Sequence, residues 1–152
     1  MVLKLDLVKA FDQVNWTFLR LVLLQIGIPV EGVNWIMGCV FSSNFAVLVN
    51  GTPSNFFPGS RGICQGCHFS PLLFILVIES LILIILDAQR KGKIKGIQLY
   101  PSPAITHLYF VDDVILFGVG IVDEWKAYKE ALDLLCSTIG MTVSLEKSSF
   151  FI

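Results

Sequence analysis

Two adjacent carboxylates, Asp112 and Asp113, interrupt an otherwise apolar stretch and constrain this chain more than any other feature. The segments 105–110 and 114–118 on either side are short and rich in β-branched and aromatic residues, which predicts two strands joined as a hairpin with both aspartates at its tip. Two anions at the end of a buried hairpin repel each other and resist desolvation, so they must be neutralised or must bind a cation. Because Asp also suits ordinary polar turns, a cation site needs support from the rest of the chain.

The composition indicates one domain with a high content of hydrophobic residues. The chain has 152 residues, of which 55% are hydrophobic and 15% charged, and its mean hydropathy is +0.75. The longest apolar run, 71–86, contains Glu79, which favours a buried helix over a membrane span. A small membrane-associated protein anchored by this run is the alternative.

No signal peptide is visible, so we expect an intracellular protein. The net charge of −1 does not supply the positive field of an autonomous nucleic-acid binder.

Hydrophobic periodicity and turn residues predict an α+β chain of antiparallel strands backed by helices. The expected elements of the first half are a strand at 1–7, helices at 14–26 and 31–41, a hairpin of 45–49 with 54–57, and a glycine-spaced loop at 58–66. A long helix follows, with Ser70 as its N-cap, Pro71 as its first residue and its end near Gly92. The rest of the chain is expected to form a short strand at 97–100, a helix at 122–139 ended by Gly140, and an extended tail.

Two further aspartates lie near the amino terminus. Asp6 ends the first predicted strand, and if that strand neighbours the hairpin, Asp6 meets Asp112. Three carboxylates with no histidine nearby in sequence favour Mg²⁺ over zinc, and two such ions could clamp the attacking and leaving oxygens of a phosphoryl group. For Asp12 we prefer an N-cap ahead of the helix 14–26.

The loop before the long helix offers a second set of polar groups. Arg61, Gln65 and free backbone N–H groups beside a helix start suit a phosphate or the edge of a base pair. Cys64 and Cys67 have the Cys-x-x-Cys spacing of metal or redox sites, with His68 adjoining. No second Cys or His pair completes a zinc site, and no thioredoxin-like pattern surrounds the two cysteines. With four cysteines in the chain, reduced thiols are the expectation.

Two other polar residues lie outside these groups. Lys147 could donate a proton or stabilise a departing anion, although a lone lysine is usually a solvated surface charge. For His107, on the first hairpin strand, a packed or hydrogen-bonded role is favoured over catalysis.

Taken together, four ordered segments resemble reverse transcriptases, and more closely those of plant non-LTR (LINE-type) retrotransposons: 5–12, 60–74, 110–113 and 140–147. The resemblance implies the palm of a right-hand polymerase, in which Asp6, Asp112 and Asp113 hold two Mg²⁺ ions, with Mn²⁺ as a possible substitute. It also implies an RNA template, a DNA primer and dNTPs as partners, with the primer 3′-hydroxyl attacking the α-phosphate and pyrophosphate leaving.

The same resemblance assigns roles to individual residues. Phe11 falls where the family keeps an aromatic steric gate against a 2′-hydroxyl. Gln65 and Gly66 match the loop that rests against the nascent base pair, and Arg61 lies near the nucleotide. Lys147 matches the lysine proposed to protonate pyrophosphate.

Some positions depart from the family pattern. Cys64 stands where the family often has Arg, His68 replaces a usual Pro, and Leu145-Glu146 precedes Lys147. None of these changes removes a carboxylate, but loss of the Arg weakens local phosphate attraction.

The resemblance also bounds the domain. Residues 1–152 are expected to be a partial reverse transcriptase domain, the palm, without fingers, thumb or endonuclease. Those subdomains would come from a longer polyprotein, so we expect no activity from the palm in isolation. A catalytically inactive retrotransposon remnant is the alternative within the same lineage.

Overall fold

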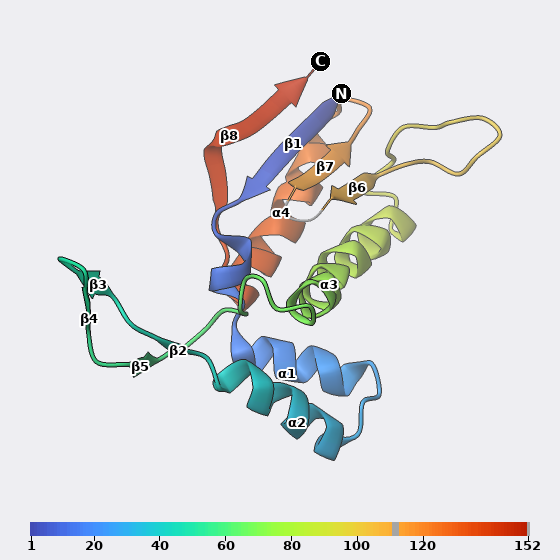
Figure 1. Cartoon of the computed structure of the whole chain (residues 1–152). Helices are drawn as coiled ribbons and strands as arrows, with labels where there is room; N and C mark the ends of the chain where they lie inside the picture. The colour runs from blue at the N-terminus through green and yellow to red at the C-terminus, as the bar shows by residue number, and fades with distance from the viewer. Residues whose placement is uncertain (111–112, 152) are drawn as a thin grey trace.

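The computed structural model describes residues 1–110 and 113–151, which fold around one four-stranded antiparallel sheet with the strand order β6-β7-β1-β8 (Figure 1). The strands are β1 (Val2–Leu7), β6 (His107–Phe110), β7 (Asp113–Phe117) and β8 (Val143–Phe151). The first strand of the chain therefore lies in the middle of the sheet, between two strands from the carboxyl-terminal third.

Alternation along β1 and β7 gives the sheet two different faces. Leu5, Leu7, Val114 and Leu116 are at most 5% exposed and belong to the hydrophobic core. The residues between them, which point to the other face because side chains alternate along a strand, include Lys4, Asp6 and Asp113. The helices α3 (Ser70–Arg90) and α4 (Val122–Ile139) lie on the buried side (Figure 1). We call these two sides the covered face and the open face.

The helices α1 (Trp16–Gln25) and α2 (Val30–Phe41) form a helical hairpin that packs on α3 through α1. The N-cap of α1 is Asn15, whose Oδ1 accepts the Phe18 N–H at 3.1 Å. The prediction that Asp12 caps this helix is therefore wrong. Asp12 is instead part of a short 3₁₀ helix, η1 (Ala10–Gln13), which the chain enters at Lys9 in the left-handed region with φ +44°.

The long helix α3 begins at Ser70, one residue before the predicted first residue Pro71. Its N-cap is Phe69, so the prediction of Ser70 as N-cap is wrong, and no side chain caps the helix. Ser70 is already inside the helix and buried. Within the described residues, α3 is the one helix long and apolar enough to cross a membrane. One side of it is buried in the core, while Leu72, Ile75 and Leu83 on the other side are exposed.

Between α2 and α3 the chain forms an arm that stands away from the sheet (Figure 1). It consists of two short antiparallel pairs: β2 (Asn44–Phe45) with β5 (Phe57–Pro58), and β3 (Leu48–Val49) with β4 (Thr52–Pro53). The predicted hairpin is confirmed in outline. The predicted strand 97–100 is wrong, because only a single bridge joins Ile97 to Ile105 there in the described structure.

A buried carboxylate, that of Glu124, joins the start of α4 to two neighbouring segments by hydrogen bonds. Glu124 is 3% exposed, and its carboxylate accepts the backbone N–H groups of Lys95, Gly96 and Val119 at 2.8 to 2.9 Å. The helix ends at Gly140, in the left-handed region with φ +84°, where a residue with a Cβ would be strained. The predicted bounds of this helix are confirmed.

Candidate active site

Asp6 and Asp113 face each other across the two central strands. The register of β1 with β7 makes them direct partners, and Asp113 also pairs with Phe110 of β6. Side chains of directly opposed residues project from the same face, so both carboxylates lie on the open face. The condition set by the sequence analysis, that the first strand neighbours the hairpin, is met by the pairing of β1 with β7. It placed Asp113 at the hairpin tip, however, and Asp113 is the first residue of β7. Asp112, the predicted partner of Asp6, lies outside the described residues.

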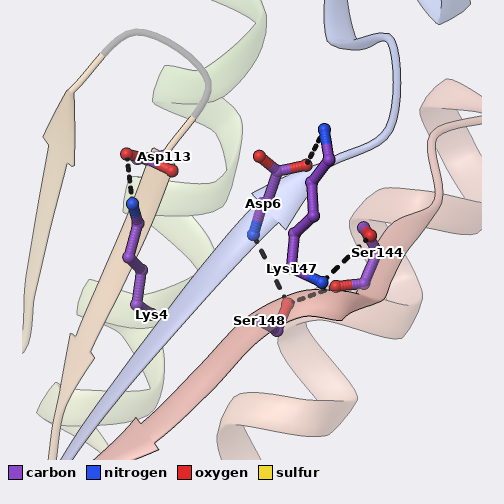
Figure 2. A network of polar contacts seen from close by, with 6 residues as sticks. All are labelled: Lys4, Asp6, Asp113, Ser144, Lys147 and Ser148. Carbon is purple, nitrogen blue, oxygen red and sulfur yellow. Dashed lines mark hydrogen bonds and ion pairs between the residues drawn. The ribbon is translucent and has the colours of Figure 1, made fainter.

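Each of these carboxylates contacts a lysine ammonium group (Figure 2). Lys4 Nζ lies 2.8 Å from Asp113 Oδ2, and Lys147 Nζ lies 3.8 Å from Asp6 Oδ1. Like charges placed directly opposite each other destabilise a sheet, and two nearby cations offset that repulsion. Sequence reasoning missed Lys4. Its signal was the spacing Lys4-x-Asp6 on a strand, which places both side chains on one face.

An irregularity in β8 brings Lys147 to Asp6. Lys4 is paired with Ser149 and Asp6 with Ser144, so the single residue between them on β1 faces the four residues 145–148 on β8. The bulge is closed by Ser148 Oγ, which donates to the Ser144 carbonyl oxygen at 2.6 Å and accepts the Asp6 N–H at 3.4 Å (Figure 2). The Lys147 N–H is 3.4 Å from Ser144 Oγ. Extra residues in one strand commonly redirect a side chain near a functional site.

Hydrogen bonds join the glycine-spaced loop to residues 11–16, in and after the 3₁₀ helix η1. The Gly62 N–H donates to Val14 O and the Ile63 N–H to Phe11 O, each at 2.8 Å, and Trp16 Nε1 donates to Gly62 O. A Cβ at Gly62 would lie 2.7 Å from the Asp12 carbonyl oxygen, and its φ is +87°. Only glycine fits there, so this glycine lets the loop approach the segment that follows Asp6.

The other predicted binding residues lie on this loop or beside it. Gln65 Nε2 donates to Asp12 Oδ1 at 3.2 Å, and Gly66 adopts φ +90° in an exposed turn. Arg61 is exposed. Phe11 stacks on Phe74 of α3, with ring centroids 4.7 Å apart. The structure thus groups Asp6, Asp113 and Lys147 on the open face, and it holds Arg61, Gln65 and Gly66 on a loop tied to the Phe11 segment.

Beside Phe11 lies a largely apolar pocket of about 330 Å³ between α3 and β6. Tyr109 lines it, and its buried hydroxyl has no hydrogen-bond partner among the described residues. Burial raises the pKa of Tyr109 above its ordinary range. His107 lies on the same strand, where its Nδ1 is 2.8 Å from Thr106 Oγ1, and burial lowers its pKa. The prediction of a packed, hydrogen-bonded His107 is confirmed.

The donor chemistry of the open face fits a hard divalent cation. Asp6 and Asp113 supply carboxylate oxygens, the ligands that Mg²⁺ and Mn²⁺ prefer. Their side chains are 20% and 26% exposed, which leaves them accessible from solvent. Within residues 1–110 and 113–151, no group of three or more His, Cys, Asp or Glu side chains is arranged to hold a metal. The two carboxylates are therefore the part of the predicted ligand set that the structure places.

The sequence profile of the family described as reverse transcriptase (RNA-dependent DNA polymerase) matches residues 1–152. The chain belongs to the reverse transcriptase family. This reverse transcriptase domain is 29% identical over 149 residues to the Pol polyprotein of a type-1 retrotransposable element R2 of Popillia japonica, covering 96% of the domain and 23% of the polyprotein. It is 26% identical over 148 residues to a 149 kDa protein of transposon TX1 of Xenopus laevis, of which it covers 11%. An uncharacterized mitochondrial protein of Arabidopsis thaliana is 43% identical over 67 residues, which are 43% of the domain and 55% of that protein.

Solved structures confirm the fold. Telomerase from Candida albicans matches with a TM-score of 0.73 and 12% identity over 99% of the domain and 27% of that chain. Apo telomerase from Candida tropicalis matches with a TM-score of 0.68 and 16% identity over 97% of the domain and 30% of that chain. The prediction of an α+β right-hand polymerase fold is confirmed, as is the likeness to non-LTR retrotransposon reverse transcriptases. Plant origin stays a prediction.

Proposed function

We propose that this domain is the palm of a non-LTR retrotransposon polymerase that joins dNTPs to a DNA primer on an RNA template. The observation that carries the proposal is the direct pairing of Asp6 with Asp113 on the open face, next to Lys147. Together with the family, this pairing supports a site for nucleotidyl transfer, because carboxylates that share one face of a sheet can hold cations against phosphate oxygens.

In this proposal Asp6 and Asp113, with Asp112, bind two Mg²⁺ ions, or Mn²⁺ in their place. When bound, such ions supply positive charge at the attacking and leaving oxygens of the transferred phosphoryl group. Lys4 and Lys147 hold the carboxylates in position by supplying positive charge on the same face. Divalent binding therefore competes with two ammonium groups.

The remaining residues would act on the nucleotide and the base pair. Lys147 carries a proton on Nζ next to Asp6 and would give it to the departing pyrophosphate. Phe11, held by its stack on Phe74, would exclude a 2′-hydroxyl. Gln65 and Gly66 would rest against the nascent base pair, on a loop whose position is fixed by Gly62, and Arg61 would lie near the phosphates.

The polymerase would need more than this domain. The domain spans 23% of the R2 polyprotein of Popillia japonica that it matches, and its net charge of −1 supplies little attraction for a nucleic-acid backbone. We propose that fingers and thumb segments of a longer polyprotein grip the template and primer. The isolated domain is accordingly expected to bind divalent cations weakly and to extend no primer.

Cation binding and primer extension test the proposal separately. Mn²⁺ binding to the purified domain, measured by electron paramagnetic resonance, should weaken at least about tenfold in Asp6→Asn and in Asp113→Asn. It should not change in Asp123→Asn, a carboxylate on α4 that is paired with Lys126. Equal affinity in all four proteins would reject the site.

Extension of a DNA primer on an RNA template distinguishes a working palm from a remnant. The domain would be joined to the flanking segments of an R2-type polyprotein and compared with the same fusion carrying Asp112→Asn and Asp113→Asn. Extension that is lost in the double variant supports polymerisation. Mn²⁺ binding without any extension by the fusion would identify an inactive remnant.

A second candidate, a membrane-associated protein, is motivated by the apolar and partly exposed α3. Carbonate-resistant association with membranes after expression would support it, whereas recovery in the soluble or aggregate fraction would count against it. The buried side of α3, which packs in the core, favours the polymerase palm.

A further inference from the structure

Three of the four cysteines line a single groove. Cys39 of α2, Cys64 of the glycine-spaced loop and Cys67 just after that loop border a space of about 370 Å³ between α2 and the start of α3. The other walls are mostly apolar and include Trp35 and Leu73. All three cysteines are exposed, so reagents in solution can reach them. The fourth, Cys136, lies on α4 outside this groove.

Within the groove, Cys64 and Cys67 are placed as a pair. They flank the two-residue turn of Gln65 and Gly66, and Gly66 supplies the positive φ of +90° at the second turn position. A turn of this kind holds the Cα atoms of its flanking residues within about 7 Å of each other, which overlaps the range that a disulfide spans. Both residues line the same groove.

The two sulfur atoms have different surroundings. Hydrogen bonds from the backbone of Phe69 and Ser70, at the first turn of α3, lower the pKa of Cys67. Cys64 Sγ lies 3.5 Å from the Gln65 carbonyl oxygen, to which a thiol donates. Because the thiolate is the nucleophile, Cys67 is the thiol that attacks first, and Cys64 is the neighbour that can attack second.

We propose that Cys64 and Cys67 form a thiol–disulfide exchange site that accepts small-molecule disulfides in this groove. The Cys67 thiolate attacks one sulfur of the disulfide, forming a mixed disulfide and releasing one thiolate. The Cys64 sulfur, losing its proton to solvent, then attacks the Cys67 sulfur and releases the second thiolate. Two protein thiols and one disulfide thereby become one protein disulfide and two small thiols, with the small disulfide as the oxidant.

Formation of the Cys64–Cys67 disulfide would affect the proposed polymerase site by changing the loop that carries Gln65. A Cys64–Cys67 disulfide closes a small ring around Gln65 and Gly66, and Gln65 is the residue that contacts Asp12. This effect on the site rests on the proposed function, whereas the exchange itself does not. Thiol chemistry is therefore measured directly and not through polymerisation.

The experiment treats the complete chain with excess oxidised glutathione near neutral pH and follows each cysteine by peptide mass spectrometry. Cys67 should react faster than in the same chain unfolded in urea, because a lower pKa raises the thiolate fraction more than it lowers the nucleophilicity of the thiolate. The final product should be a disulfide joining Cys64 and Cys67. Cys67 reacting no faster than in the unfolded chain would overturn the proposal.

Three serine variants assign the two steps. Cys64→Ser should stop the reaction at a glutathione adduct on Cys67, and Cys67→Ser should slow the reaction at Cys64. Cys39→Ser is the matched control, because Cys39 lines the same groove from another helix, and it should leave the Cys64–Cys67 product unchanged. A product that joins Cys39 to either of the other cysteines would overturn the assignment of the pair.

Discussion

The covered face and the open face of the sheet are built by alternate residues of the same two strands, β1 and β7, yet the two faces have different roles. On the covered face Leu5, Val114 and Leu116 are buried in the core. On the open face Asp6 and Asp113 oppose each other with a lysine beside each. Because the strand period separates the two sets, stability and chemistry can be altered independently. Substitutions on each face test how complete that separation is.

The largest effect should come from Leu116 on the covered face, which is fully buried. Leu116→Ala should lower the free energy of unfolding by about 2 to 5 kcal/mol, through lost burial and the cavity left behind. Its neighbour Ile115 points to the open face, and Ile115→Ala should cost clearly less. Urea denaturation of the two variants measures the difference. Equal losses would show that the open face is also part of the stabilising core.

Glu124 extends the comparison to a polar group on the covered side. Its carboxylate accepts three backbone N–H groups, so Glu124→Gln turns an amide N–H₂ toward at least one donor. We expect a loss of about 1 to 3 kcal/mol in the free energy of unfolding. Glu130→Gln on the same helix is the control, since its pair with Lys93 is exposed, and it should change stability by less than about 0.5 kcal/mol. If the two variants lose equal stability, the three hydrogen bonds to the Glu124 carboxylate contribute nothing to the free energy of unfolding.

The two faces also differ in how far the sequence predicts them. The alternating burial on β1 follows from the two-residue hydrophobic period of a strand, and the end of α4 follows from the glycine at position 140. Both can be predicted because they depend only on neighbouring residues in the sequence. The opposition of Asp6 and Asp113 depends on strand register, and a shift by one residue would exchange the two faces. With two adjacent aspartates, the sequence does not determine which of them opposes Asp6. The predicted partner was Asp112, whereas the structure describes the pairing of Asp6 with Asp113.

Helix starts show a second limit. Asp12 and Asn15 both have side chains that cap helices, and the left-handed turn at Lys9 decides between them by placing Asp12 in a 3₁₀ helix. The β8 bulge that brings Lys147 to Asp6 likewise depends on side-chain hydrogen bonds between Ser144 and Ser148. Neither feature has a signal in hydrophobic periodicity. The motif resemblance located the site, and register and bulges determined which atoms meet there.

Lys4 offers a smaller test, specific to the open face. Its ammonium group contacts the Asp113 carboxylate, so a divalent ion must compete with it. Lys4→Met should raise Mn²⁺ affinity about two- to fivefold, the range expected for an exposed ion pair of about 0.4 to 1 kcal/mol. Lys147→Met should raise it less, because Lys147 Nζ is 3.8 Å from Asp6 and mostly exposed. Weaker Mn²⁺ binding by Lys4→Met would mean that the lysine organises the carboxylates for metal instead of competing with it.

The smallest effect should be the pH dependence contributed by His107, whose partner across the sheet is Leu116 of the covered face. Burial lowers the pKa of His107 in the folded protein below its value of about 6.5 in an unfolded chain. Between those two values the unfolded state binds more protons, so stability falls as the pH decreases. Free energies of unfolding measured by urea denaturation at about pH 7.5 and about pH 5.5 should therefore differ less in His107→Asn than in the parent.

His68→Asn is the control for that measurement, because His68 is exposed between the glycine-spaced loop and α3. This variant should keep the pH dependence of the parent. A parent that becomes more stable at the lower pH, with the gain lost in His107→Asn, would mean that protonated His107 gains a partner on folding. Glu79 is the carboxylate whose charge favours the protonated form of His107. Such a result would place an ion pair within the covered face and so break the separation of stability from charge between the two sides of the sheet.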